Sequence, residues 1–173
     1  MIKVVDAINH TRLEDNLNDI QEVSDILDIS AVSFDLVTTL CGEYIGRGAY
    51  RSVYEYNLDH RYVIKVEPEN TGCNLVEYMI WEEVKGLVGS LEWVKDWFAP
   101  CGWISPNGKL LTMRKTKDLD RDRPDKVPKF LWDVKPDNFG WIGNKFVCHD
   151  YGQLYNMVSY PKGMKKIKWY EYE

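Results

Sequence analysis

The stretch from Glu43 to Val66 constrains the fold more than any other part of the chain. It is rich in β-branched and aromatic residues, which favour strands, and it is interrupted by glycines at Gly46 and Gly48 and by the polar run 57–60. Glycines and short polar runs between strand-forming segments are typical of turns. The sequence therefore predicts three successive strands joined by two turns, as in an antiparallel sheet.

Helical spacing occurs on both sides of this region. Residues 74–88 carry Leu75, Met79 and Val84, with Leu87 or Val88, at helical intervals, and we expect their apolar face to pack on the sheet. Residues 13–29 predict a second helix that packs on the domain or, alternatively, binds a partner. Its apolar face comprises Leu13, Leu17, Ile20, Val23, Ile26 and Leu27.

The rest of the chain predicts shorter elements. Residues 94–116 indicate two strands around the turn Pro106-Asn107-Gly108, and residues 117–128, charged and with two prolines, indicate a loop or linker. The segment 146–152 is typical of a short buried strand that runs into a turn. The last residues show no clear periodicity. Together these patterns predict an α+β fold with an antiparallel sheet, a packed helix and a small second lobe.

Charge and composition exclude several classes of protein. The 173 residues carry a net charge of −5, which argues against a general nucleic-acid binder, although Lys162, Lys165, Lys166 and Lys168 lie near Trp169. The four cysteines are widely spaced, so neither zinc nor a redox dithiol is indicated. Because no stretch approaches 18 uncharged apolar residues, we expect a cytoplasmic protein with no membrane contact. The acidic total favours a solvated charged tail over nucleic-acid binding by these lysines, so a nucleic-acid partner is not expected.

Two features of the strand region suit a phosphate ligand. Glycines at 46 and 48 allow the backbone to approach a ligand closely, although two glycines in a hairpin are usually only a turn. Lys65 shares a strand face with Val63, so it faces the glycine hairpin if Ile64 and Val66 face the core. Taken alone, Lys65 is typical of an ordinary exposed strand lysine.

The run Asp133-Val134-Lys135-Pro136-Asp137-Asn138 is the most specific signal in the chain. Phosphoryl transfer to a hydroxyl needs a carboxylate to accept the proton, a cation at the γ-phosphate and an amide oxygen near Mg²⁺. Asp150, in Asp150-Tyr151-Gly152, follows Asn138 by twelve residues and ends an apolar strand, where a carboxylate can bind Mg²⁺.

The order of these motifs resembles that of protein kinases. The glycine segment is similar to the kinase glycine-rich loop, and Val63-Ile64-Lys65 is similar to the strand that carries the phosphate-binding lysine. The run from Asp133 to Asn138 is similar to the catalytic loop, and Asp150-Tyr151-Gly152 is similar to the kinase motif Asp-Phe-Gly. The resemblance covers about residues 43–155. The compactness of the chain is similar to that of kinase-like proteins carried by bacteriophages, in which case the host cytoplasm is the expected location.

The resemblance implies a role for each matching residue. Gly46 and Gly48 would cover the ATP phosphates, Val53 would pack on adenine, and Met113 to Lys115 would form the adenine-binding hinge. Lys65 would contact phosphates and pair with Glu77, with Glu82 or Glu83 as alternative partners. The remaining roles are the base Asp133, the γ-phosphate contact Lys135, and the Mg²⁺ ligands Asn138 and Asp150.

The sequence also departs from the kinase pattern. Arg51 replaces the third glycine of the loop, where it would crowd the phosphates or add a cation to them, and Leu131-Trp132 replaces the usual His-Arg. Only residues 116–132 separate the expected hinge from Asp133, and 21 residues follow Gly152, so the large helical lobe cannot fit. Expected boundaries are a helical extension (1–40), an N-lobe (41–116), a reduced C-lobe (117–155) and a tail (156–173).

Two functions remain open from the sequence. The first is an ATP- and Mg²⁺-dependent phosphotransferase, a minimal Ser/Thr protein kinase acting on a protein substrate. The second is a kinase-like module that binds nucleotide and inhibits or regulates a partner protein, which the missing lobe favours.

Overall fold

The computed structural model describes residues 36–69, 71–118, 122–154 and 160–169. The chain divides into two compact units, Met1–Leu40 and Cys41–Glu173. In the first unit, residues 36–40 are helical. The helix predicted at 13–29 lies outside the described residues.

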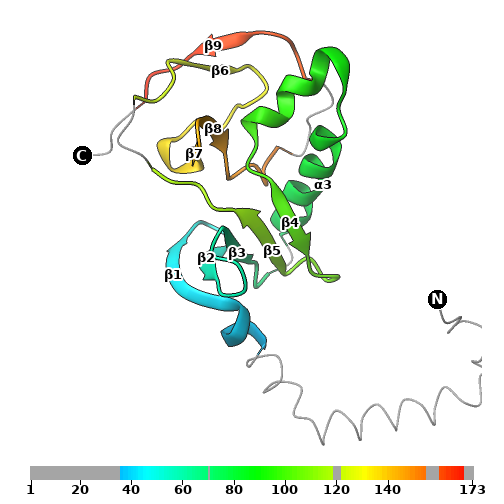
Figure 1. Cartoon of the computed structure of the whole chain (residues 1–173), viewed down its shortest axis with the longest axis vertical. Helices are drawn as coiled ribbons and strands as arrows, with labels where there is room; N and C mark the ends of the chain where they lie inside the picture. Colours follow the sequence, from blue (N-terminus) through cyan, green and yellow to red (C-terminus); the bar gives the residue numbers. More distant parts are fainter. Residues whose placement is uncertain (1–35, 70, 119–121, 155–159, 170–173) are drawn as a thin grey trace, which may run out of the picture. The chain divides into compact units, whose positions relative to one another are not determined.

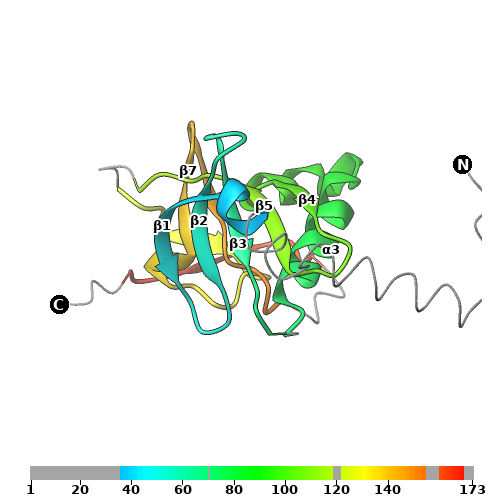
Figure 2. The ribbon, with the colours of Figure 1, turned by 90° about the horizontal axis from the view of Figure 1, so that it is seen from below.

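The second unit is built on one five-stranded antiparallel sheet (Figures 1 and 2). Its spatial order is β1-β2-β3-β5-β4. The three strands and the hairpin that the sequence predicted are confirmed, so the α+β class with an antiparallel sheet is confirmed too. The strands are β1 (Cys41–Arg47), β2 (Ser52–Tyr56), β3 (Tyr62–Val66), β4 (Cys101–Ile104) and β5 (Leu110–Arg114).

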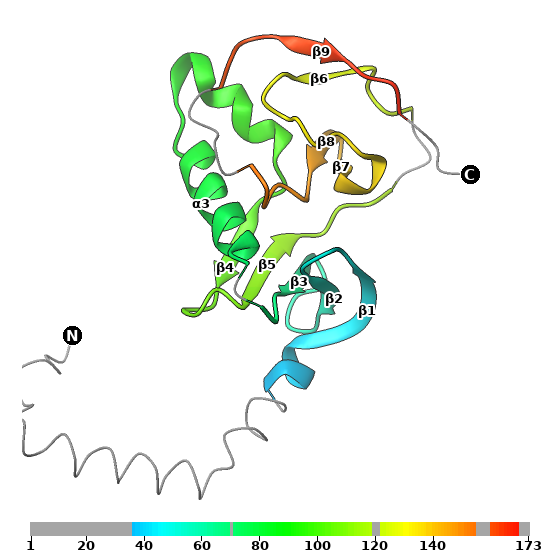
Figure 3. The same cartoon turned by 180° about the vertical axis from the view of Figure 1, so that it is seen from behind.

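Helix α3 (Cys73–Lys85) packs against β4 and β5, as the view from behind shows (Figure 3). The helix was predicted, but its inward face was predicted only in part: Val84 is buried as expected, whereas two other residues of the expected face are exposed. Leu75 and Met79 are 50% and 60% exposed. The buried residues of the helix are Cys73, Asn74, Glu77, Ile80 and Val84. Hydrophobicity alone misplaces part of this face because two of the inward residues, Asn74 and Glu77, are polar and form hydrogen bonds inside the protein.

A 3₁₀ segment, η2 (Gly89–Trp97), follows the helix. The sequence pattern extended the first strand of the next hairpin back to Val94, which is wrong, since β4 begins only at Cys101. Val94 is fully buried in η2. Periodicity cannot separate a short strand from a short 3₁₀ segment when both are apolar on one side.

Two small strand pairs complete the unit. Strands β7 (Phe139–Ile142) and β8 (Lys145–Cys148) form a hairpin directly after the 3₁₀ turn η3 (Pro136–Asn138). Strand β6 (Lys126–Pro128) pairs with β9 (Met164–Lys166), and the two run side by side in Figure 1. The expected linker and the expected tail therefore contribute strands to the same compact unit, because each supplies the other's hydrogen-bond partner.

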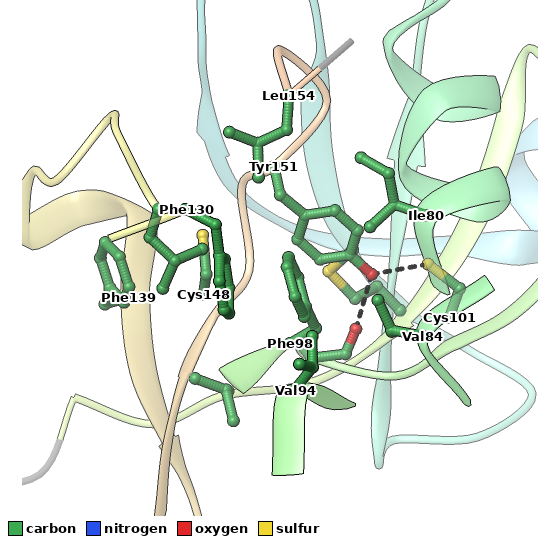
Figure 4. Packing of buried hydrophobic residues seen from close by; sticks show 14 of the residues in the cluster. Ile80, Val84, Val94, Phe98, Cys101, Phe130, Phe139, Cys148, Tyr151 and Leu154 are labelled. Atoms are coloured by element: carbon green, nitrogen blue, oxygen red, sulfur yellow. Dashed lines mark hydrogen bonds between the residues drawn. The ribbon is translucent and has the colours of Figure 1, made fainter. Parts of the chain in front are cut away.

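The core of this unit is aromatic (Figure 4). Phe98 lies edge-on to Tyr151, with ring centroids 5.0 Å apart, and stacks on Phe130 at 5.9 Å. The hydroxyl of Tyr151 donates to the Ala99 carbonyl at 2.8 Å and lies 3.1 Å from Cys101 Sγ. The core thus fixes the segment that begins at Asp150. In the part of the chain that the structure describes, no helix is long and apolar enough to cross a membrane.

Candidate functional site

Lys65 on β3 and Glu77 on α3 form a buried ion pair of 2.9 Å. The exposed fraction is 4% for Lys65 and zero for Glu77. Strand β3 is the central strand of the sheet, and Glu77 of α3 lies over Lys65, so Lys65 is not the ordinary exposed lysine that its strand position alone suggested. Glu82 and Glu83, the alternative partners, bind Lys85 and Tyr160 instead.

Glu77 accepts hydrogen bonds from four residues. Besides Lys65, it accepts from Arg51, whose Nη1 lies 2.7 Å from Oε2 and whose Nη2 lies 3.0 Å from Oε1. The backbone N–H groups of Tyr151 and Gly152 donate to Oε1 at 3.0 and 3.2 Å. One buried carboxylate thereby joins β3, the start of β2 and the segment after β8.

Arg51 is the site residue whose position the sequence left undecided. Its guanidinium is buried, with 7% of the residue exposed, and also binds the Asp150 carboxylate, with Nη2 2.6 Å from Oδ1. The presence of an arginine where the resemblance to kinases leads one to expect a third glycine was the sequence signal for an unusual role of this residue. The side chain of Arg51 does not project into solvent. Its guanidinium lies between the carboxylates of Glu77 and Asp150 and binds both.

The charges of this cluster shift the pKa of Glu77 and of Arg51 towards their ionised forms. Burial alone would raise the pKa of Glu77, but the charges of Arg51 and Lys65 lower it to about 2. Burial likewise opposes the charge of Arg51, yet the carboxylates of Glu77 and Asp150 raise its pKa. Two cations and two anions therefore form a balanced ionic cluster.

Acid should destabilise the protein through Glu77. Since its pKa falls from 4.5 to about 2 on folding, this stabilisation is present above pH 4.5 and is lost as the pH falls towards 2. We expect the free energy of urea unfolding to fall by about 2 kcal/mol more in the wild type than in Glu77→Gln between about pH 5 and pH 3. Equal losses in the two proteins would contradict this assignment.

The Asp133 loop forms its own polar cluster. The amide of Asn138 donates to the Asp133 carbonyl at 3.0 Å and to its carboxylate at 2.9 Å, and Lys135 Nζ lies 3.1 Å from Asp133 Oδ1. Asn138 is 6% exposed, whereas the Lys135 side chain is 58% exposed. The amide thus orients a carboxylate that solvent can still reach, as the side chain of Asp133 is 24% exposed.

His149 connects this loop to the ionic cluster, a role that the sequence analysis missed. Its backbone N–H donates to the Asn138 carbonyl at 2.8 Å, and its carbonyl accepts from Lys65 Nζ at 2.5 Å. Its ring nitrogens lie 2.8 Å from Thr116 Oγ1 and 2.8 Å from the Asp137 carbonyl. Burial, with the charge of Lys65, lowers the pKa of His149, which favours the neutral ring. The position directly before Asp150 was the only available signal.

The glycine hairpin leaves space beside the cluster. A Cβ added at Gly46 or Gly48 would meet no atom within 4 Å, and neither glycine has the positive φ that such loops often require. Val53 lies opposite Lys65 in the β2–β3 register, so the two share one face of the sheet. The hairpin has open space at both glycines, and Val53 and Lys65 lie on the same face of the sheet.

The expected hinge, Met113 to Lys115, lies at the end of β5. Met113 is fully buried inside β5, between β3 and β4, and Arg114 is still in the strand. The backbone N–H of Arg114 donates to the Pro100 carbonyl and that of Lys115 to the Arg61 carbonyl. The N–H groups of Arg114 and Lys115 are therefore already bonded within the protein.

The residues expected to bind Mg²⁺ fit it in kind. Asn138 and Asp150 supply oxygen donors from neighbouring segments, and Mg²⁺ is commonly held by one or two carboxylates together with substrate phosphates. Among the described residues, no group of three or more His, Cys, Asp and Glu side chains could hold a metal alone. The Asp150 carboxylate, 45% exposed, is already bound to Arg51.

The tail residue Trp169 packs inward. Its ring lies edge-on to Phe139 and Phe146, each at 5.6 Å, and its Nε1 donates to the Pro124 carbonyl at 2.8 Å. These contacts leave Trp169 a structural role rather than that of a stacking platform for bases.

Comparison of the chain with models of protein families, with curated proteins and with solved structures gives no match.

Proposed function

We propose that this chain is a minimal kinase-like phosphotransferase that uses ATP and Mg²⁺ to phosphorylate a Ser or Thr hydroxyl of a protein. The observation that carries the proposal is the buried 2.9 Å pair between Lys65 and Glu77, with Glu77 also accepting from the N–H groups after Asp150. Segments far apart in the sequence thus meet at one carboxylate, which supports the proposal because phosphoryl transfer depends on positioned charges.

The residues would divide the work as follows. Lys65 would bind phosphate oxygens while Glu77 holds its ammonium in place, and the open backbone at Gly46 and Gly48 would lie over the phosphates. Asn138 and Asp150 would hold Mg²⁺, whose charge would offset that of the phosphates.

Asp133 would act on the acceptor hydroxyl. The Asn138 amide orients its carboxylate, which would accept the hydroxyl proton as the oxygen forms a bond to the γ-phosphorus. The bond from the γ-phosphorus to the bridging oxygen breaks, and ADP leaves. Lys135, largely exposed beside Asp133, would turn from that carboxylate to the transferred phosphoryl group.

A second function is favoured by a specific contact. Because Arg51 binds Asp150 at 2.6 Å, the carboxylate needed for Mg²⁺ is in use, which suits a kinase-like module that binds a partner without catalysis. This alternative predicts that the protein binds ATP but transfers no phosphoryl group.

The test is transfer from γ-phosphate-labelled ATP with Mg²⁺, to the protein itself and to proteins of a cell extract. We expect Lys65→Met and Asp133→Asn each to lower transfer about a hundredfold or more, since each removes a group that positions or activates a reactant. The matched control is Asp137→Asn, the same change at an exposed carboxylate of the same loop, which should keep most of the activity.

Each outcome separates the two functions. Label that disappears in Lys65→Met and Asp133→Asn but persists in Asp137→Asn supports the phosphotransferase. Transfer that is unaffected by Asp133→Asn would show that Asp133 is not the base. No label with any acceptor, while ATP still raises the melting temperature, would favour the binding module.

A further inference from the structure

We propose that the Arg51 guanidinium and a divalent cation are alternative partners of the Asp150 carboxylate, so that Arg51 is a built-in competitor at the metal site. The inference rests on the proposed function only in taking Asp150 as the metal ligand. It concerns a residue that replaces a loop glycine, and it assigns that residue a definite effect on how the site is loaded.

The contact geometry makes the two partners exclusive on the same oxygen. Arg51 Nη2 lies 2.6 Å from Asp150 Oδ1, and the guanidinium is held in place by two further contacts to Glu77. A Mg²⁺ ion binds oxygen at about 2.1 Å, so on Oδ1 it would stand within about 5 Å of the guanidinium. Cations at that separation repel strongly in a partly buried site.

The charge balance of the cluster leads to the same conclusion. The positive charges of Arg51 and Lys65 match the negative charges of Glu77 and Asp150. A divalent cation added to this set leaves an excess of two positive charges in a region where Arg51, Lys65 and Glu77 are nearly excluded from water. Without Arg51, the set has one negative charge in excess, and a cation is attracted.

Removal of Arg51 should leave the rest of the cluster connected. Glu77 keeps its 2.9 Å pair with Lys65 and the two backbone N–H donors of Tyr151 and Gly152. Asp150 loses its arginine partner but remains 45% exposed, so its carboxylate can be hydrated. A purely structural role for Arg51 would therefore show as lost stability, without tighter metal binding.

The experiment measures binding of Mn²⁺, an oxygen-binding substitute for Mg²⁺ that can be counted by the electron paramagnetic resonance of the free ion. Nucleotide is left out. We expect Arg51→Met and Arg51→Gln to bind Mn²⁺ roughly tenfold more tightly than the wild type, or better, because a repelling charge beside the ligand is gone. Asp150→Asn added to Arg51→Gln should abolish the gain.

The matched control is Arg61→Met. Arg61 also forms an arginine–aspartate pair, 2.7 Å from Asp59, but its side chain is 70% exposed and the pair lies on a turn. The change in net charge is identical, so an unspecific effect of charge would appear in both proteins. Arg61→Met should leave Mn²⁺ affinity at the wild-type level.

Folded Arg51 variants with wild-type Mn²⁺ affinity, or with a gain that survives Asp150→Asn, would overturn the proposal. If both variants fail to fold, the wild type is titrated with Mg²⁺ while the Nε–H signal of Arg51 is followed by NMR. That signal should shift as the metal binds, and an unchanged signal at saturation would overturn the proposal equally.

The proposed function can fail independently. Absence of ATP binding and of phosphoryl transfer would remove the phosphotransferase, but the Mn²⁺ titration contains no nucleotide and keeps its meaning. Conversely, an active enzyme whose Arg51 variants bind Mn²⁺ no better than the wild type would retain the function and lose only the role of Arg51.

Discussion

Glu77→Ala is expected to lower the free energy of unfolding by about 3–5 kcal/mol, the cost of breaking a buried ion pair by removing one partner. Glu77 is completely buried and binds two cations that are themselves almost buried, Lys65 and Arg51. Its loss removes the carboxylate that balances the buried charge of Lys65. It also removes the acceptor of the N–H groups of Tyr151 and Gly152. Urea denaturation at neutral pH measures the effect.

Glu82→Ala is the matched control for this change. Glu82 lies on the same helix, but it is exposed and pairs only with the exposed Lys85. Exposed pairs of this kind contribute at most about 1 kcal/mol, so Glu82→Ala should stay within that limit. If both variants lost the same small amount, the ionic cluster would not be holding α3 on the sheet.

Phe98→Ala is expected to cost about 3–5 kcal/mol of unfolding free energy, the range for a buried aromatic side chain replaced by alanine. Phe98 is 1% exposed and contacts both Tyr151 and Phe130 (Figure 4). The cavity would open directly beside Tyr151, the neighbour of Asp150. We therefore expect near-ultraviolet circular dichroism of the aromatic residues to change along with stability.

The control for Phe98→Ala is Leu58→Ala, at a side chain that is 66% exposed in the turn between β2 and β3. Since that side chain is mostly in water already, its removal should change stability by about 0.5 kcal/mol or less. A folded Phe98→Ala protein with wild-type stability would mean that the aromatic core is not the main support of the Asp150 segment.

The strands could be predicted from the sequence because strand formers and turn formers alternate clearly between Glu43 and Val66. The glycine hairpin, β3 and the hairpin at Pro106-Asn107-Gly108 follow from local chemistry alone. The pairing of β6 with β9 could not be predicted, because neither segment has an apolar alternation and each becomes a strand only through the other.

The site was predictable where a motif fixes both residue type and spacing. Lys65 and Glu77 meet as expected because a strand and the next helix bring them together. The inward face of α3 was not predictable by hydrophobicity, since Leu75 and Met79 point outward while Glu77 points inward. The contact of Arg51 with Asp150 was left undecided and the role of His149 was missed, because the partners in these contacts lie 99 and 33 residues away along the chain.

The packing of Trp169 has a consequence for the synthesis of the chain. The ring of Trp169 packs on Phe139, the residue after Asn138. Strand β9 pairs with β6, which ends a few residues before Asp133. A nascent chain that ends before β9 lacks both supports, although all residues of the five-stranded sheet and of α3 have already been made. Domains fold as they emerge from the ribosome, so the Asp133 loop should be the last part of the site to take its final shape.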